Sequence, residues 1–187
     1  MYLNKFILTA IISIGLLHAE TSLSLNINDE DLELQTELNF NALTDYSSGT
    51  TYILGANYLH TNRDDLATIS FSGENSLQGI YGLTLAFGLK TVITDDFLAL
   101  PLFAKAVYDL PLIDSIPTTS LVTSLAYAPS VLSFSDAEKY TEFRIEADIE
   151  VISNIHIFTG YRTIDTDYET YDKSFNDSFY GGLKISF

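Results

Sequence analysis

Hydrophobic and polar residues alternate strictly along residues 140–151, which read YTEFRIEADIEV. One parity is apolar apart from Thr141, and it includes Phe143, Ile145 and Ile149. A period of two is that of a β-strand, whereas a helix with a period near 3.6 would scatter these residues around its axis. The pattern therefore predicts a strand with an apolar face and a charged face. The charged face carries Glu142, Arg144, Glu146, Asp148 and Glu150.

Two architectures accommodate such a strand. In a soluble sandwich, the apolar face packs on another sheet and the charged face meets water. In a transmembrane barrel, the apolar face meets lipid and the charged face points into a polar lumen.

Similar segments recur along the chain and predict ten strands. Most have 8–13 residues, and a tilted strand needs roughly 9–11 residues to cross a bilayer. The weakest patterns are at 66–71 and 118–127, and without these two crossings eight strands remain. Pro101 predicts a bulge or a local distortion, because proline donates no ladder hydrogen bond. The predicted strands are 21–28, 32–40, 50–60, 66–71, 80–92, 97–109, 118–127, 140–151, 155–164 and 175–187.

The first 19 residues have the pattern of a secretory signal peptide. Lys5 supplies a positive charge, residues 6–17 are almost all apolar, and Ala19 offers a small residue before Glu20. We expect cleavage after Ala19, which leaves 20–187 as a single mature domain. The even strand count then places both termini on the periplasmic side.

Composition excludes several other classes of protein. The 187-residue chain has no cysteine, so it has neither disulfides nor a thiolate metal site. A net charge of −16 with only 9 basic residues excludes a nucleic-acid partner. No apolar run in the mature chain reaches the roughly 20 residues of a transmembrane helix. An acidic soluble β-protein, a secreted sandwich and an outer-membrane barrel remain.

The C-terminus favours the barrel. Residues 180–187 (YGGLKISF) resemble the C-terminal assembly signal of bacterial outer-membrane barrels, with Gly182, Ile185 and Phe187 at the matching positions. Tyr180 stands where that signal usually has a polar residue. The resemblance implies recognition by the barrel-assembly machinery, and contact with outer-membrane lipid and lipopolysaccharide in a Gram-negative bacterium.

Three segments also resemble the YfaZ family of small outer-membrane proteins. These are residues 128–140 (APSVLSFSDAEKY), 160–162 (GYR) and 175–178 (FNDS), and the resemblance is best from about Tyr81 to the end. It implies an antiparallel transmembrane β-barrel in the outer membrane, and it carries no catalytic motif.

If the apolar parity faces lipid, the opposite parity points into the lumen. The inward set contains six acids and five bases, so strong ion selectivity is not expected. These charges either line a pore that favours cations or pair with one another and fill the interior. Barrels of about eight strands are just wide enough to be filled by side chains, which favours the ion-paired interior. The predicted lumen-facing charges are Glu33, Glu37, Lys90, Lys105, Glu142, Arg144, Glu146, Asp148, Glu150, Arg162 and Lys184.

The sequence does not favour catalysis, a cofactor or a metal site. Signal removal leaves only His60 and His156, and no G-x-S-x-G motif is present. His156 is interpreted as a polar residue of the lumen or rim rather than a base. The acidic segment 165–172 (DTDYETYD) lacks the EF-hand pattern, so it predicts a solvated extracellular loop. Its Tyr168 and Tyr171, with Tyr161 and Tyr180, are alternatively part of an interfacial aromatic girdle.

These inferences predict an all-β, ten-stranded outer-membrane barrel that is not an enzyme. Its predicted function is that of a narrow, porin-like channel with an ion-paired polar lumen. The alternative is a non-conducting structural or interaction barrel that acts through its extracellular loops. A barrel enzyme and a soluble periplasmic β-protein are the remaining alternatives. No feature of the sequence indicates an oligomeric state.

Overall fold

The computed structural model describes residues 21–44, 49–62, 64–112, 117–135, 137–168 and 172–187. The predicted signal peptide 1–19 and its cleavage site lie outside the described residues, as does Tyr171.

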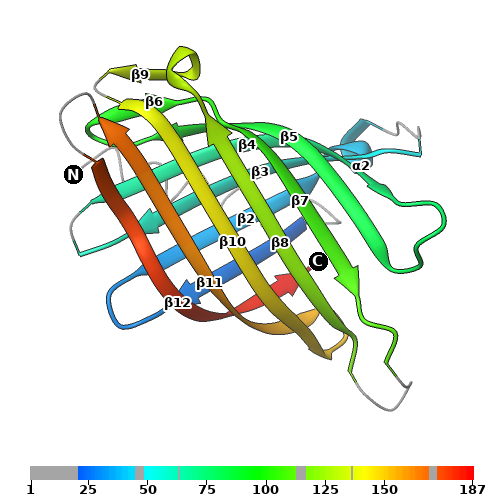
Figure 1. Cartoon of the computed structure of the whole chain (residues 1–187). Coiled ribbons are helices and arrows are strands. Elements are labelled where there is room, and N and C mark those ends of the chain that lie inside the picture. The colour runs from blue at the N-terminus through cyan, green and yellow to red at the C-terminus, as the bar shows by residue number, and fades with distance from the viewer. Residues whose placement is uncertain (1–20, 45–48, 63, 113–116, 136, 169–171) are drawn as a thin grey trace.

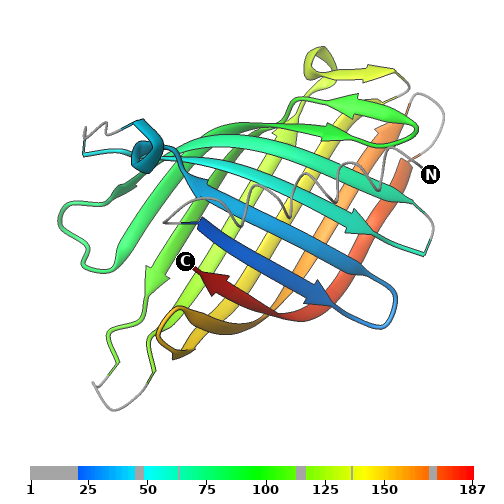
Figure 2. The same ribbon diagram turned by 180° about the vertical axis from the view of Figure 1, so that it is seen from behind.

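Ten antiparallel strands close into a single barrel (Figures 1 and 2), as the alternation predicts. Each strand pairs with both of its neighbours, and β1 pairs with β12 to complete the ring. The eight-stranded alternative is therefore wrong. The barrel strands are β1 (Thr21–Ile27), β2 (Leu32–Asn39), β3 (Thr51–His60), β4 (Asp65–Ser76), β5 (Leu83–Ile93), β7 (Leu102–Asp109), β8 (Thr119–Ala128), β10 (Ala137–Ile152), β11 (Ile155–Tyr168) and β12 (Asp172–Ser186).

Several strands extend beyond the predicted limits. β4 takes in residues 72–76, which lie beyond the predicted strand 66–71, because they pair with β3 and β5. Most of the predicted loop 165–172 is strand, since Asp167 lies opposite Asp172. Polar side chains do not prevent this pairing, because ladder hydrogen bonds join backbone groups only.

Pro101 interrupts the wall at the predicted position. The segment divides into β6 (Phe97–Ala99) and β7, and the Pro101 carbonyl accepts a hydrogen bond from the Lys90 amide at 3.0 Å. β6 pairs with the end of β5 and with β9 (Ser133–Ser135), which follows the short 3-10 helix η1 (Ser130–Leu132). β6 and β9 therefore add a short ribbon at one rim (Figure 1).

The two ends of the barrel differ. Both ends of the described chain meet at one of them, where the Phe187 amide donates to the Thr21 carbonyl at 2.8 Å. We call this the terminal end, and it also carries the short helix α2 (Phe40–Thr44), which the sequence did not predict. The opposite or far end carries the turns 28–31 and 94–96 and the β6–β9 ribbon.

The outer surface is an apolar belt. Residues directly opposite on neighbouring strands share a face, so Leu102, Leu89 and Phe71 form one outward row across β7, β5 and β4. All three side chains are exposed, and so are Phe87 and Leu183. None of the described helices has the length and apolar character needed to span a membrane.

A buried apolar cluster lies at the far end of the interior, and we call it the apolar cap. Its members lie where strands enter and leave the far turns. Phe97 stands at its centre, with its ring centroid 6.1 Å from those of both Tyr140 and Tyr168. The cap consists of Leu59, Leu66, Val92, Phe97, Ala99, Ala128, Ala137, Tyr140, Ile164, Tyr168 and Phe175.

Candidate functional site

A buried ion cluster is centred on Glu33 of β2. It reaches the cap through Glu142, which accepts a hydrogen bond from the Tyr140 hydroxyl at 2.7 Å and lies 3.9 Å from Arg144. The Glu33 carboxylate accepts hydrogen bonds from Arg162 Nη1 at 2.5 Å and from Arg144 Nη2 at 2.7 Å. The Arg162 guanidinium also lies 3.5 Å from an oxygen of Asp31. Glu33 and Arg162 are each 1% exposed, so water cannot neutralise these charges and their partners must. The cluster consists of Asp31, Glu33, Arg144 and Arg162.

The strand register explains why one carboxylate holds two arginines. Arg144 and Arg162 lie directly opposite each other on β10 and β11 and would repel without a shared counter-ion. The Tyr180 ring lies beneath both, with its centroid 5.5 Å and 5.4 Å from the two guanidinium carbons. Sequence reasoning placed both arginines in the lumen but missed Asp31 and the role of Tyr180. The amides of Asn26 and Asn57, which also donate to Glu33, were missed as well.

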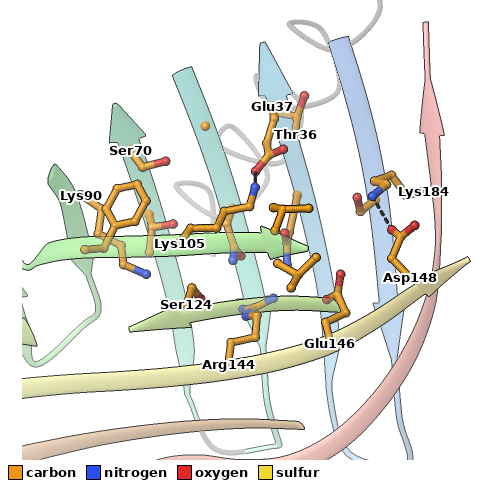
Figure 3. Close-up of a pocket in the computed structure, with 18 of the residues that line it drawn as sticks. Thr36, Glu37, Ser70, Lys90, Lys105, Ser124, Arg144, Glu146, Asp148 and Lys184 are labelled. Atoms are coloured by element: carbon orange, nitrogen blue, oxygen red, sulfur yellow. Dashed lines mark hydrogen bonds and ion pairs between the residues drawn. The ribbon is translucent and has the colours of Figure 1, made fainter. Parts of the chain in front are cut away.

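Next to the ion cluster lies a cavity of about 250 Å³ (Figure 3). Every one of the ten barrel strands contributes at least one lining residue, so the cavity is the lumen of the barrel. Hydroxyl and amide side chains alternate with charged ones on its wall. The charged or ionisable lining residues are Glu37, Lys90, Lys105, Glu142, Arg144, Glu146, Asp148, His156 and Lys184.

Ion pairs occupy most of these side chains. Lys90 Nζ lies 2.6 Å from Glu142 Oε2, and Lys105 Nζ lies 3.1 Å from Glu37 Oε1. Lys184 pairs with Asp148, as the dashed line in Figure 3 shows. His156, which we interpreted as a simple polar residue, places Nδ1 2.6 Å from Asp148 Oδ1. Most charges of the lumen wall therefore form local pairs, and they do not form two surfaces of opposite charge.

The eleven predicted lumen charges fall into three places. Eight line the cavity, and Glu33 and Arg162 lie in the buried cluster. Glu150 stands apart at the rim of the terminal end, where it accepts a hydrogen bond from the Asn154 amide at 3.1 Å.

Exposure indicates which end of the cavity opens to solvent. The Glu37 side chain, near the terminal end, is 45% exposed, whereas the Arg144 side chain is 12% exposed. Glu33, which adjoins the far end, is 1% exposed. Glu37 also lines a second hollow together with Thr21 and Ser186, which stand at the terminal end. The exposure of the described side chains thus falls from the terminal end of the lumen towards the ion cluster and the cap.

The residues of the predicted C-terminal signal have distinct positions. Tyr180 points inward and donates from its hydroxyl to Glu146 Oε2 at 2.9 Å. Gly182 also faces inward, against the Phe158 ring. Ile185 and Phe187 are exposed on the outer face.

The aromatic girdle is wrong for two of its members. Tyr168 is 5% exposed in the cap and Tyr180 is 4% exposed in the lumen. Tyr161 does lie on the outer face, where its ring centroid is 4.9 Å from that of Phe179.

The geometry does not assemble a catalytic or metal site in the described part of the chain. There, His156 bonds to Asp148 and to no hydroxyl group that could serve as a nucleophile. Across the described ranges, no three His, Asp or Glu side chains are grouped so as to hold a metal ion.

Two solved structures show weak likeness to this fold. A chain from a structure described as "KdgM porin in complex with disordered oligogalacturonate" is 10% identical, with 90% of this chain and 99% of that chain covered and a TM-score of 0.46. A chain from "Unveiling the Mechanism Behind the in-meso Crystallization of Membrane Proteins" is also 10% identical, with 89% and 82% covered and a TM-score of 0.43. Neither likeness is close enough to support an inference about function.

Comparison by sequence is more specific. No curated protein matches the chain. The family model described as YfaZ precursor matches residues 3–187, which is nearly the whole sequence, and it agrees with the resemblance seen in residues 128–140, 160–162 and 175–178. The chain belongs to the YfaZ family.

Proposed function

We propose that this protein is a small outer-membrane barrel whose lumen is closed to free diffusion. The apolar belt supports the membrane setting, because exposed rows such as Leu102, Leu89 and Phe71 would be costly in water and are suited to lipid. Lys90 and Lys105 on two of these strands point the other way, into the lumen.

The observation that carries the proposal is the presence of two buried layers at the far end. The apolar cap fills the interior around Phe97, and the ion cluster around Glu33 adjoins it. A hydrated ion crossing the barrel would have to displace both the packed rings and the paired charges. Each layer resists this, since apolar packing excludes water and unpaired buried charges are strongly unfavourable.

The termini give the barrel its orientation. With Thr21 and Phe187 on the periplasmic side, the open cavity faces the periplasm and the cap faces the cell exterior. The outward Ile185 and Phe187 are then available to the barrel-assembly machinery, and the belt is in contact with lipid and lipopolysaccharide.

A narrow porin-like channel is the second candidate. It is favoured by a polar cavity that all ten strands line, and it requires a second conformation in which the cap and the Glu33 pairs separate. An interaction barrel that uses its outer loops is less favoured, because far-end connections such as 28–31 and 94–96 are short.

Planar-bilayer conductance of the refolded mature protein tests the proposal. Heat-modifiable migration on a gel first establishes that the barrel has folded. We expect no single-channel steps from the wild type, and steps from the double variant Arg144→Ala/Phe97→Ala, which thins both layers. A matched double variant on the outer face, Leu183→Ala/Phe179→Ala, should stay silent. Steady steps from the wild type would overturn the proposal in favour of the porin-like channel.

A further inference from the structure

One carboxylate in the cavity has no cationic partner. Glu37, Glu142 and Asp148 each pair with a lysine, as described above. Glu146 accepts only the neutral Tyr180 hydroxyl, at 2.9 Å, and makes no ion pair with any described residue. Figure 3 shows its side chain pointing from β10 into the cavity.

The cavity has no spare base to match it. Lys90, Lys105 and Lys184 are each held by a carboxylate, and Arg144 is held by Glu33. Lys105 is in fact shared, since Glu74 also lies 3.9 Å from its Nζ. The unmatched charge of the wall is therefore negative, which favours a cationic ligand over an anionic one.

Apolar side chains lie directly beside this carboxylate. Val122 stands opposite Glu146 on β8, and Val107 stands opposite Val122 on β7, so the three form a row across adjacent strands. Both valines line the cavity. On the other side, Gly160 lies opposite Glu146 and leaves the space that the Tyr180 ring fills.

We infer that the cavity binds a small organic ammonium ion, with its nitrogen on Glu146 and its short apolar body against Val122 and Val107. An ammonium group has three N–H donors. Glu146 accepts one of them, and the hydroxyl of Ser124, which lines the cavity on the adjacent strand β8 two residues from Val122, is a further acceptor. A volume of about 250 Å³ is below the roughly 300–1,000 Å³ of pockets for drug-sized ligands, so the cavity suits a small ligand. The ligand reaches the site from the terminal end, where the lumen is open.

Isothermal titration calorimetry of the refolded mature barrel in detergent tests this site with n-propylammonium. We expect propylammonium to bind, and the neutral 1-propanol and the anionic propionate not to bind. Glu146→Gln should weaken propylammonium binding by about tenfold or more, because it removes a charge-assisted hydrogen bond. The matched variant Glu150→Gln, which alters a carboxylate outside the cavity, should bind as the wild type does.

Equal binding of propylammonium by the wild type and Glu146→Gln would overturn the inference, as would binding of propionate. Absence of binding by a folded wild-type barrel would do the same. If Glu146→Gln does not fold, two measurements on the wild type test the inference. These are its selectivity for propylammonium over propanol and propionate, and infrared spectroscopy of its carboxyl groups. A protonated-carboxyl band that propylammonium does not remove would show that Glu146 carries a proton instead. The site requires only the cavity, so its failure is distinct from the appearance of channel current.

Discussion

Glu33 and Arg162 make a buried ion pair at 2.5 Å although they are 129 positions apart in the chain. The pair connects β2 with β11 across the barrel interior, and Arg144 on β10 binds the same carboxylate. Three strands are therefore joined by one acidic side chain.

Neutralisation of Glu33 should strongly destabilise the folded barrel. Glu33→Gln leaves Arg144 and Arg162 opposite each other without their shared counter-ion, and we expect a loss of about 3–5 kcal/mol in the free energy of unfolding. Urea unfolding in detergent measures it. Glu30→Gln, a matched change at an exposed turn residue, should be neutral. A Glu33→Gln barrel that unfolds with the wild-type midpoint would contradict the role given to the cluster.

Removal of one of the two arginines should cost less. In Arg144→Ala, Glu33 keeps Arg162 and Glu142 keeps Lys90, so we expect a loss of roughly 2 kcal/mol, the range for hydrogen bonds to charged groups. The cap stays in place, so this single variant should remain silent in planar bilayers. An Arg144→Ala barrel with the wild-type free energy of unfolding and no bilayer current would show that Arg144 does not stabilise the folded barrel.

The apolar cap offers a second test of stability. Phe97 packs between Tyr140 and Tyr168 and is 3% exposed, so Phe97→Ala should destabilise the barrel by about 3–5 kcal/mol. Phe179→Ala makes the same chemical change at a side chain that is 76% exposed on the outer face, and it should cost far less. Similar unfolding midpoints for the two variants would place Phe97 outside the core.

Two adjacent glycines near the C-terminus should respond differently to a methyl group. A Cβ at Gly182 would lie 2.5 Å from the Phe158 ring and would also overlap the Leu25 carbonyl oxygen, whereas at Gly181 the nearest atom is 3.6 Å away. We expect Gly182→Ala to lose about 1–3 kcal/mol by overpacking, and Gly181→Ala to be tolerated. Refolding into detergent without any assembly factor separates this steric effect from signal recognition. Equal refolding yields would mean that Gly182 matters only as part of the signal.

The sequence predicted the strands and the direction of their side chains because a period of two is a local property. It predicted that Glu33, Arg144 and Arg162 all face the lumen, since each lies on the polar face of a strand whose other face is apolar. It could not predict that they meet, because contacts across a barrel depend on the tilt and stagger of all ten strands. The strand ends near Asp167 and Asp172 were missed for a related reason, as polar composition resembles that of a loop even where backbone pairing continues.

The cap was missed because its signal is weak. Leu66 is the single apolar residue on the lumen-facing side of its strand, and Leu59 and Val92 likewise stand near a strand end on the side that the strongest alternation does not mark as apolar. A single apolar residue on the lumen side does not change the alternation of its strand. Only closure of the barrel brings these single residues together.

The pairing of β1 with β12 also constrains how the molecule forms. The first and last strands are neighbours, so the ring cannot close until the whole chain is present, and such distant contacts make folding slow. The arginines that neutralise Glu33 arrive 111 and 129 residues after it. Until then the interior charges need water, and the outer rows need lipid or a chaperone. Closure of the barrel wall and exclusion of water from the interior therefore occur together, late in folding. A chain truncated before β11 and β12 cannot complete this step.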